Sequence, residues 1–113
     1  MHELKIAEDL SVIVLDTAFN NHLSKVTKIN IIFGQMIQIV PDIFEFAFRE
    51  IVRNSVAESA ELNIKIIPVE MQCKNCGSAF LVAENRFSCS TCNSTDLDII
   101  HGKELFIKSI EGE

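Results

Sequence analysis

The chain has 113 residues, a length that suits one domain, or one domain carrying a small inserted module. Its formal net charge of −6 argues against nucleic-acid binding, because phosphates call for a basic surface. It has no uninterrupted run of about 18 apolar residues, and no basic stretch precedes an apolar run at the start. The sequence therefore predicts neither a membrane segment nor a signal peptide, and we expect a cytoplasmic protein.

The first third of the chain predicts a helix followed by a strand. Residues 3–22 have helical periodicity, because apolar side chains recur three or four positions apart: Ala7, Leu10, Ile13, Val14 and Ala18. Residues 27–33 alternate as a strand does, with Ile29, Ile31 and Phe33 on one face. A loop is expected from Gly34 to Val40.

A second helix and two further strands follow. Pro41 suits the first position of a helix that we expect to reach about residue 58. Its apolar stripe is interpreted as core packing: Ile43, Phe44, Ala47, Phe48, Ile51 and Val52. Residues 62–67 and 104–110 are predicted strands.

Four cysteines form two CxxC pairs, Cys73/Cys76 and Cys89/Cys92. In a cytoplasmic protein, such pairs are more often metal ligands than disulfides. Four thiolates satisfy a tetrahedral Zn²⁺ and leave no open position, which is typical of a structural site. A thioredoxin-like redox pair would call for a single CxxC at a helix start, and an iron centre remains an alternative.

The order of elements predicts an α+β fold. Two helices should pack on a small three-stranded sheet, with a zinc-ribbon module inserted before the last strand. The expected domains are residues 1–70 with 102–113, and the module at residues 71–101.

The N-terminus is a second candidate metal site. The amine of Met1, the amide and imidazole of His2 and the amide of Glu3 could form a square plane of nitrogens, which Ni²⁺ and Cu²⁺ favour. An early histidine also occurs by chance as a surface residue. His22 and His101 are interpreted as surface residues.

Several segments together carry a family resemblance: Met1-His2-Glu3-Leu4, Ile31-Ile32-Phe33-Gly34, Val40-Pro41-Asp42, Phe46-Ala47-Phe48, both CxxC pairs and Gly102-Lys103-Glu104-Leu105. With these, nearly the whole chain resembles the HypA/HybF family of nickel-insertion proteins for hydrogenase maturation. The chain departs from the family pattern at Lys5, Gln35 and Val40, so no extra carboxylate ligand is expected from the loop before Pro41.

The resemblance implies a nickel metallochaperone and not an enzyme. It implies Ni²⁺ as cargo, with His2 as the essential ligand, Met1 contributing its amine and Glu3 supporting. It implies Zn²⁺ as the structural cofactor at the four cysteines. The product would be mature nickel–iron hydrogenase and, in some bacteria, urease.

The resemblance also implies partners. These are a nickel-handling maturation GTPase of the HypB type, the hydrogenase large-subunit precursor and a urease accessory protein. Neither nucleic acid nor a membrane is expected, and the chain should be a monomer or weak homodimer. The alternative is a zinc-ribbon docking module with no role in nickel handling. A hydrolytic or redox enzyme lacks support, because the sequence offers no open three-ligand metal site and no nucleophile motif.

Overall fold

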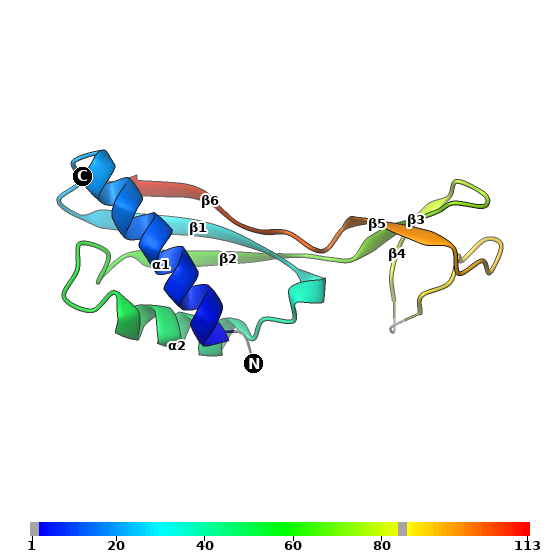
Figure 1. Ribbon diagram of the computed structural model, residues 1–113, viewed down its shortest axis with the longest axis horizontal. Helices are drawn as coiled ribbons and strands as arrows, with labels where there is room; N and C mark the ends of the chain where they lie inside the picture. The colour runs from blue at the N-terminus through cyan, green and yellow to red at the C-terminus, as the bar shows by residue number, and fades with distance from the viewer. Residues whose placement is uncertain (1–2, 84–85) are drawn as a thin grey trace. The chain divides into compact units, whose positions relative to one another are not determined.

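The computed structural model describes residues 3–83 and 86–113 (Figure 1). The chain forms two compact units. The helical unit comprises Met1–Ile32, Ile39–Lys65 and Phe106–Glu113, and the cysteine unit comprises Phe33–Gln38 and Ile66–Leu105. The segment Phe33–Gln38 of the cysteine unit includes the end of the strand Val26–Gly34.

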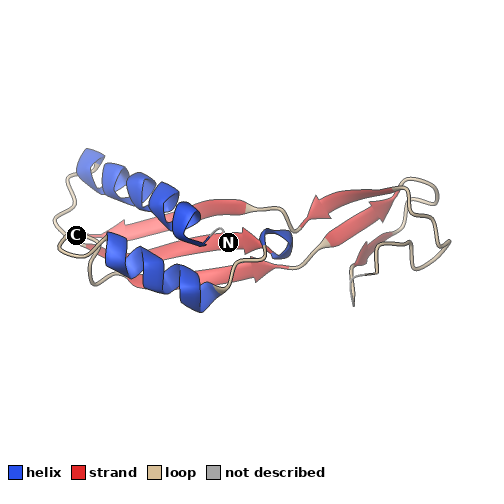
Figure 2. Ribbon diagram, turned by 60° about the horizontal axis from the view of Figure 1, so that its bottom comes forward, coloured by secondary structure: helices blue, strands red, loops and turns tan. Residues whose placement is uncertain are grey.

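The helical unit contains both long helices and most of a three-stranded sheet. The helices are α1 (Glu3–Asn20) and α2 (Pro41–Ile51), and the sheet has the order β2 (Glu61–Ile67), β1 (Val26–Gly34), β6 (Leu105–Gly112). Both helices lie over the same face of this sheet, and β1 and β2 run in the same direction (Figures 1 and 2). A helical crossover such as α2 is the usual link between strands that run in the same direction. The expected α+β class is confirmed.

Reciprocal backbone bonds set β6 antiparallel to β1. The Glu113 N–H donates to the Lys25 carbonyl at 2.8 Å, and the Lys25 N–H donates back to the Glu113 carbonyl at 3.4 Å. This exchange is characteristic of a hydrogen-bonded antiparallel pair.

The core of the helical unit is a layer of aliphatic and phenyl side chains between the helices and the sheet. It contains the predicted inward face of β1 and the phenylalanines of α2, whose rings stack with centroids 5.9 Å apart. Its fully buried members include Ala7, Val14, Ala18, Ile29, Ile31, Phe44, Phe48 and Val52. Ile13, expected on the buried stripe, is 49% exposed, because it lies on the outer edge of the helix while Ser11 takes an inward position.

α2 is shorter than the sequence predicts. It ends at Ile51 and not near residue 58, and the chain continues in turns. Asn54 adopts a left-handed conformation with φ of 64°, and the Ser55 hydroxyl donates to the Val52 carbonyl at 2.5 Å. The apolar periodicity persists past the helix end because Val52 and Ala57 are still fully buried.

A polar ladder crosses the face of the sheet opposite the helices. The Asn63 amide donates to Asn30 Oδ1 at 3.1 Å, and the Asn30 amide donates to Ser109 Oγ at 2.8 Å. These bonds join β2, β1 and β6 in one row.

The cysteine unit has its own three-stranded antiparallel sheet. Its strands are β3 (Glu70–Cys73), β4 (Ala79–Leu81) and β5 (Leu97–His101), in the order β4-β3-β5. Met71 of β3 faces Phe80 on one neighbouring strand and Ile99 on the other.

The segment Phe33–Gln38 joins this unit through its backbone. Gly34 lies so close to Gly102 that a Cβ atom at Gly34 would stand 2.1 Å from the Gly102 carbonyl carbon. The following 3₁₀ turn, η1 (Gln35–Ile37), places the Gln35 side chain where its Oε1 accepts a bond from the Val69 N–H at 3.2 Å. Only glycine fits at position 34.

Among residues 3–83 and 86–113, no helix is both long enough and apolar enough to cross a lipid bilayer.

Candidate metal sites

The four cysteines come together at one end of the β3–β5 sheet. Their sulfur atoms all lie within 4.8 Å of one another, with Cys73 Sγ 3.6 Å from Cys92 Sγ and Cys76 Sγ 3.5 Å from Cys89 Sγ. These separations are too long for a disulfide. A tetrahedron of thiolates at about 2.3 Å from Zn²⁺ has edges of about 3.8 Å, so the arrangement can hold a metal ion of this kind.

Each cysteine pair is part of a six-residue knuckle, and the two knuckles have the same backbone design. They are Cys-Lys-Asn-Cys-Gly-Ser (73–78) and Cys-Ser-Thr-Cys-Asn-Ser (89–94). In each, the N–H of the fifth residue donates to the carbonyl of the first at 2.9 Å. The N–H of the first residue in turn donates to the carbonyl of the sixth, at 2.9 Å in one knuckle and 2.8 Å in the other.

The fifth residue of each knuckle is left-handed: φ is 79° at Gly77 and 63° at Asn93. Glycine adopts this conformation freely, and asparagine is one of the few other residues that tolerate it. The sequence analysis did not single out Asn93 or the two serines. The signal was present, because both CxxC pairs are followed by a turn-forming residue and then a serine.

The knuckle backbone directs N–H groups at the first sulfur of each pair. Cys73 Sγ accepts from the N–H groups of Asn75 at 3.3 Å and Cys76 at 3.4 Å. Cys89 Sγ accepts from those of Thr91 at 3.4 Å and Cys92 at 3.5 Å. These donors stabilise negative charge on the sulfur, and the bond from the Cys76 N–H is the main cause that lowers the pKa of Cys73.

The second sulfur of each pair reaches the surface and is contacted by side chains. Cys76 Sγ lies 3.4 Å from Ser78 Oγ, and this hydroxyl is the main cause that lowers the pKa of Cys76 to about 6. The Asn75 side-chain amide donates to Cys92 Sγ at 3.5 Å and so links the two knuckles. Thiolates are the form that binds metal, so the lowered pKa of Cys76 favours binding at neutral pH.

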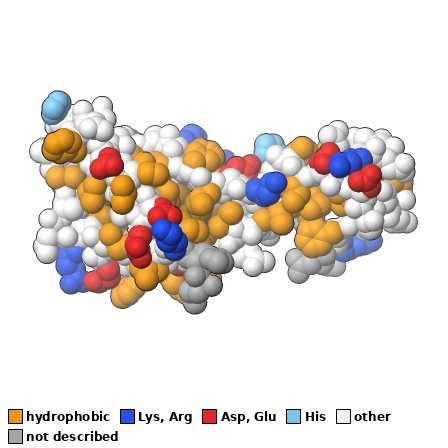
Figure 3. All heavy atoms as spheres, viewed as in Figure 1, with side chains coloured by type: hydrophobic (Ala, Val, Ile, Leu, Met, Phe, Trp, Pro, Cys, Tyr) orange, Lys and Arg blue, Asp and Glu red, His pale blue; other side chains and the backbone are white. Residues whose placement is uncertain are grey.

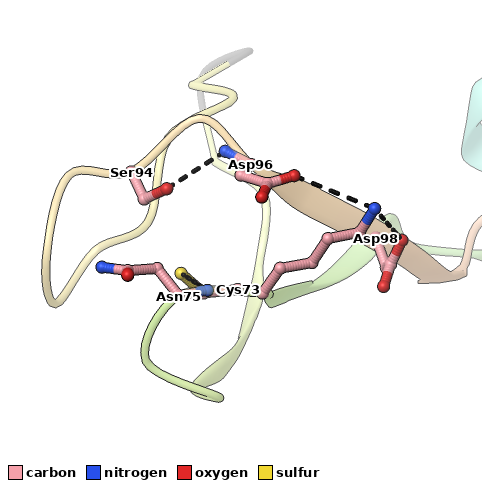
Figure 4. A network of polar contacts seen from close by, with 6 residues as sticks. Cys73, Asn75, Ser94, Asp96 and Asp98 are labelled. Carbon is pink, nitrogen blue, oxygen red and sulfur yellow. Dashed lines mark hydrogen bonds and ion pairs between the residues drawn. The ribbon is translucent and has the colours of Figure 1, made fainter.

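The one lysine of the first knuckle is held by acids. Lys74 Nζ lies 3.8 Å from Asp96 Oδ1 and 3.4 Å from Asp98 Oδ1, and the Asp96 N–H donates to Ser94 Oγ at 3.1 Å (Figure 4). The Lys74 charge is therefore balanced locally. On the face of the molecule in Figure 3, the described cations are interspersed with acidic side chains and form no continuous basic stripe.

At the other candidate site, Met1 and His2 lie outside the described residues. Glu3 is the first residue of α1 and is only 4% exposed. Its Oε2 accepts a hydrogen bond from the Val40 N–H at 3.1 Å. The other histidines lie at the surface, His22 just after α1 and His101 with its Nδ1 3.1 Å from Glu104 Oε2.

Comparison with known proteins identifies the family. A model described as "Hydrogenase/urease nickel incorporation, metallochaperone, hypA" matches residues 1–112. The chain belongs to the HypA family. The resemblance inferred from the sequence is thereby confirmed, and with it the class of nickel metallochaperones for hydrogenase and urease.

HypA relatives match over nearly the whole chain. Hydrogenase maturation factor HypA of Desulfitobacterium hafniense is 32% identical over 113 residues, which is 100% of this chain and 99% of that protein. The HypA proteins of Desulfatibacillum aliphaticivorans and Aquifex aeolicus are 37% and 34% identical, over 98% and 100% of this chain and 86% and 98% of their own.

Solved HypA structures share the fold. The solution structure of the Ni metallochaperone HypA from Helicobacter pylori superposes with a TM-score of 0.70 at 27% identity, covering 99% of this chain and 97% of that one. A second HypA solution structure gives a TM-score of 0.74 at 27% identity, covering 100% and 97%. HypA proteins are metallochaperone maturation factors, and the four-cysteine site of this chain fits that metal-handling role.

Proposed function

We propose that this HypA protein binds Ni²⁺ at Met1, His2 and Glu3 and delivers it during hydrogenase maturation. The observation that carries the proposal, beside family membership, is that α1 begins at Glu3. The first N–H groups of a helix have no acceptor within the helix. Binding of a metal by the Glu3 amide would therefore break no hydrogen bond within the helix.

The chemistry of this segment suits Ni²⁺. An amine, two deprotonated amides and an imidazole supply four nitrogens, and Ni²⁺ favours such a planar set. Two amidates balance the charge of the ion, so the chelate is neutral. Binding releases protons and must strengthen as the pH rises. The proposal requires a free amine on Met1.

Zn²⁺ is the metal that we propose for the four cysteines. The sulfur spacing and the N–H donors around the thiols support it. Four protein ligands leave no open position, so this ion would hold the cysteine unit in shape and take no part in a reaction. This arrangement fits a chaperone, because the resident ion takes a closed site and the cargo takes a separate one.

The nickel acceptors that we propose belong to the maturation machinery. They are a nickel-handling GTPase of the HypB type, the precursor of the hydrogenase large subunit and, where the enzyme is present, urease accessory proteins. Ligand exchange at a chain end allows an acceptor to replace one nitrogen at a time. We propose that the protein acts as a cytoplasmic monomer or weak homodimer.

The test is a Ni²⁺ titration of untagged, zinc-loaded protein, followed by the absorbance band of square-planar Ni²⁺. Intact mass first establishes the N-terminal residue. The variants are His2→Ala and a chain with one residue added before Met1, and His22→Ala is the matched control. Loss of the band in the first two, with zinc content and helicity unchanged, is expected. Equal binding in all four proteins would contradict the proposal and favour a zinc-ribbon docking module without nickel.

A further inference from the structure

Strand β2 forms one edge of the sheet in the helical unit, with β1 as its neighbour in the sheet. An edge strand presents a row of backbone N–H and C=O groups that can pair with another chain. Glu61, Asn63 and Lys65 alternate along β2, so their side chains lie on one face, the one that carries the polar ladder. All three are exposed. β2 therefore offers both backbone groups and polar side chains to a partner strand.

The order of these three side chains is self-complementary. Glu61 and Lys65 lie four residues apart, about 13 Å along an extended strand, so they cannot pair within one chain. If two copies of β2 run antiparallel with their Asn63 residues opposite each other, a twofold axis sets Glu61 of each copy opposite Lys65 of the other. The Cβ atoms of side chains directly opposite each other are about 4.5–5.5 Å apart, so both ion pairs can form.

We propose that β2 is the surface through which two copies of this chain associate, in this register. On the inner face, the register sets Leu62 opposite Ile64, and both are half-buried in the single chain. A register centred on residue 62 or 64 instead sets Asn63 opposite a charged side chain and loses both ion pairs. The inference does not depend on the nickel function, and of the two states proposed above it selects the weak homodimer.

The polar ladder gives a second, independent reason. The Asn63 amide donates one hydrogen to Asn30 Oδ1 at 3.1 Å. A primary amide has a second N–H and a carbonyl oxygen, and among the described residues these two groups of Asn63 make no hydrogen bond. Two such amides that meet at a twofold axis can bond to each other reciprocally. The ladder of one copy then continues into the ladder of the other.

The other edge strands of the two described sheets lack this self-complementarity. β6, at the opposite edge of the same sheet, has Lys108 and Glu111 three residues apart and hence on opposite faces. β4 has no charged side chain, and Asp98 of β5 is already paired with Lys74. Among these edges, opposite charges share a face at a spacing that a twofold axis can pair only on β2.

The experiment is sedimentation velocity of zinc-loaded protein without nickel, over a concentration series. The wild type should dimerise weakly, because a single pair of strands buries little surface. Glu61→Lys and Lys65→Glu should each weaken association on the order of tenfold, because two cross-strand pairs change from attraction to repulsion.

An equimolar mixture of these two variants should restore association, since β2 of one chain then carries only positive charge and β2 of the other only negative charge. Lys108→Glu is the matched control, because it makes the same change of charge on β6, and it should associate as the wild type does. Circular dichroism checks that every variant is folded.

Other results would overturn the inference. A wild type that stays monomeric over the whole series would do so directly. If Glu61→Lys strengthens association and Lys65→Glu weakens it, the net charge of −6 governs association and the edge pairing does not. A mixture that fails to restore association, or a Lys108→Glu variant as weak as Lys65→Glu, would place the contact elsewhere. Failure of the nickel function is distinguishable, because no metal besides zinc enters these measurements.

Discussion

The two units of this protein are stabilised in different ways. The helical unit buries a continuous set of large apolar side chains, among them Ile29, Ile31, Phe44 and Phe48, all at 0% exposure. In the cysteine unit, the buried apolar side chains among the described residues are Phe33, Val69 and Met71, besides two of the cysteines. The cysteine unit therefore cannot draw its stability from apolar burial to the same extent.

The difference indicates that the helical unit is stable without a metal, whereas the cysteine unit depends on one. In each knuckle, two backbone N–H groups point at a sulfur atom. These N–H···S hydrogen bonds are strongest when the sulfurs carry negative charge and a cation balances that charge. A chaperone built in this way can lose order in one unit while the other keeps its core.

Removal of the metal from the cysteines is expected to have the largest effect. Structural Zn²⁺ contributes roughly 10 kcal/mol or more of apparent folding free energy. Cys89→Ser should abolish amide protection in β3–β5, as measured by hydrogen exchange, and leave the protected amides of α1 and α2 unchanged. Ser90→Ala, at the exposed neighbouring position, is the control. Simultaneous loss of protection in the helices would contradict the division into two modes of stabilisation.

Truncation of a core phenylalanine should have the next largest effect, and only on the helical unit. Phe48→Ala should lower the free energy of unfolding by about 3–5 kcal/mol, because it leaves a cavity in a fully buried site. Phe46→Ala is the control on the same helix, since Phe46 is 69% exposed and should change stability by about 0.5 kcal/mol or less. Thermal unfolding followed by circular dichroism measures both. A zinc content that falls in Phe48→Ala but not in Phe46→Ala would show that the units depend on each other.

Substitution of the left-handed residue in the second knuckle, Asn93, should have a smaller effect on stability, confined to the cysteine unit. Asn93→Ala should weaken that unit by about 1–2 kcal/mol, because alanine is strained at a φ of 63°. Asn93→Gly should be close to neutral, since glycine occupies the equivalent position 77 of the other knuckle. Zinc transfer to a chromophoric chelator measures the difference. Equal zinc loss in both variants would mean that the Asn93 side chain matters and its backbone conformation does not.

The smallest predicted effect concerns pH. The Ser78 hydroxyl lowers the pKa of Cys76 to about 6, so the thiolate form is favoured above that value and its contribution is lost as the pH falls through it. Ser78→Ala should raise this pKa, move zinc release to higher pH and weaken zinc affinity by about tenfold at neutral pH.

Ser94→Ala is the matched control for that variant, because the Ser94 hydroxyl accepts from the Asp96 N–H and makes no hydrogen bond with a cysteine sulfur among the described residues. A zinc-release curve followed by a chromophoric indicator separates the two variants. An identical shift in both would assign the effect to the loop and not to the sulfur contact.

The sequence predicted the parts of the molecule that depend on periodicity and spacing. The helix from residue 3, the inward face of Ile29 and Ile31 and the grouping of the four cysteines all follow from patterns along the chain. The C-terminal end of α2 did not follow, because Val52 and Ala57 continue the apolar pattern in a segment that folds as turns.

Contacts between residues far apart in the chain could not be predicted from the sequence either. The interaction of Glu3 with Val40 joins positions 37 residues apart, and neither residue type predicts it. The outward position of Ile13 depends on how α1 is rotated against the sheet, and the helical spacing of apolar residues does not fix that rotation to better than roughly a few tens of degrees. The proposed roles of Met1, His2 and the zinc ligands remain predictions.

The ladder of Asn63, Asn30 and Ser109 limits where residues can be inserted into the chain or deleted from it. A slip of one residue in either edge strand would send its ladder residue to the opposite face and break a bond to Asn30. The polar side chains on the outer face of the sheet thus favour the same strand register as the apolar packing on the inner face. An added or deleted residue between α2 and β2 must therefore be absorbed in the turns of residues 52–60, which makes that stretch the place where length variation can accumulate at least cost.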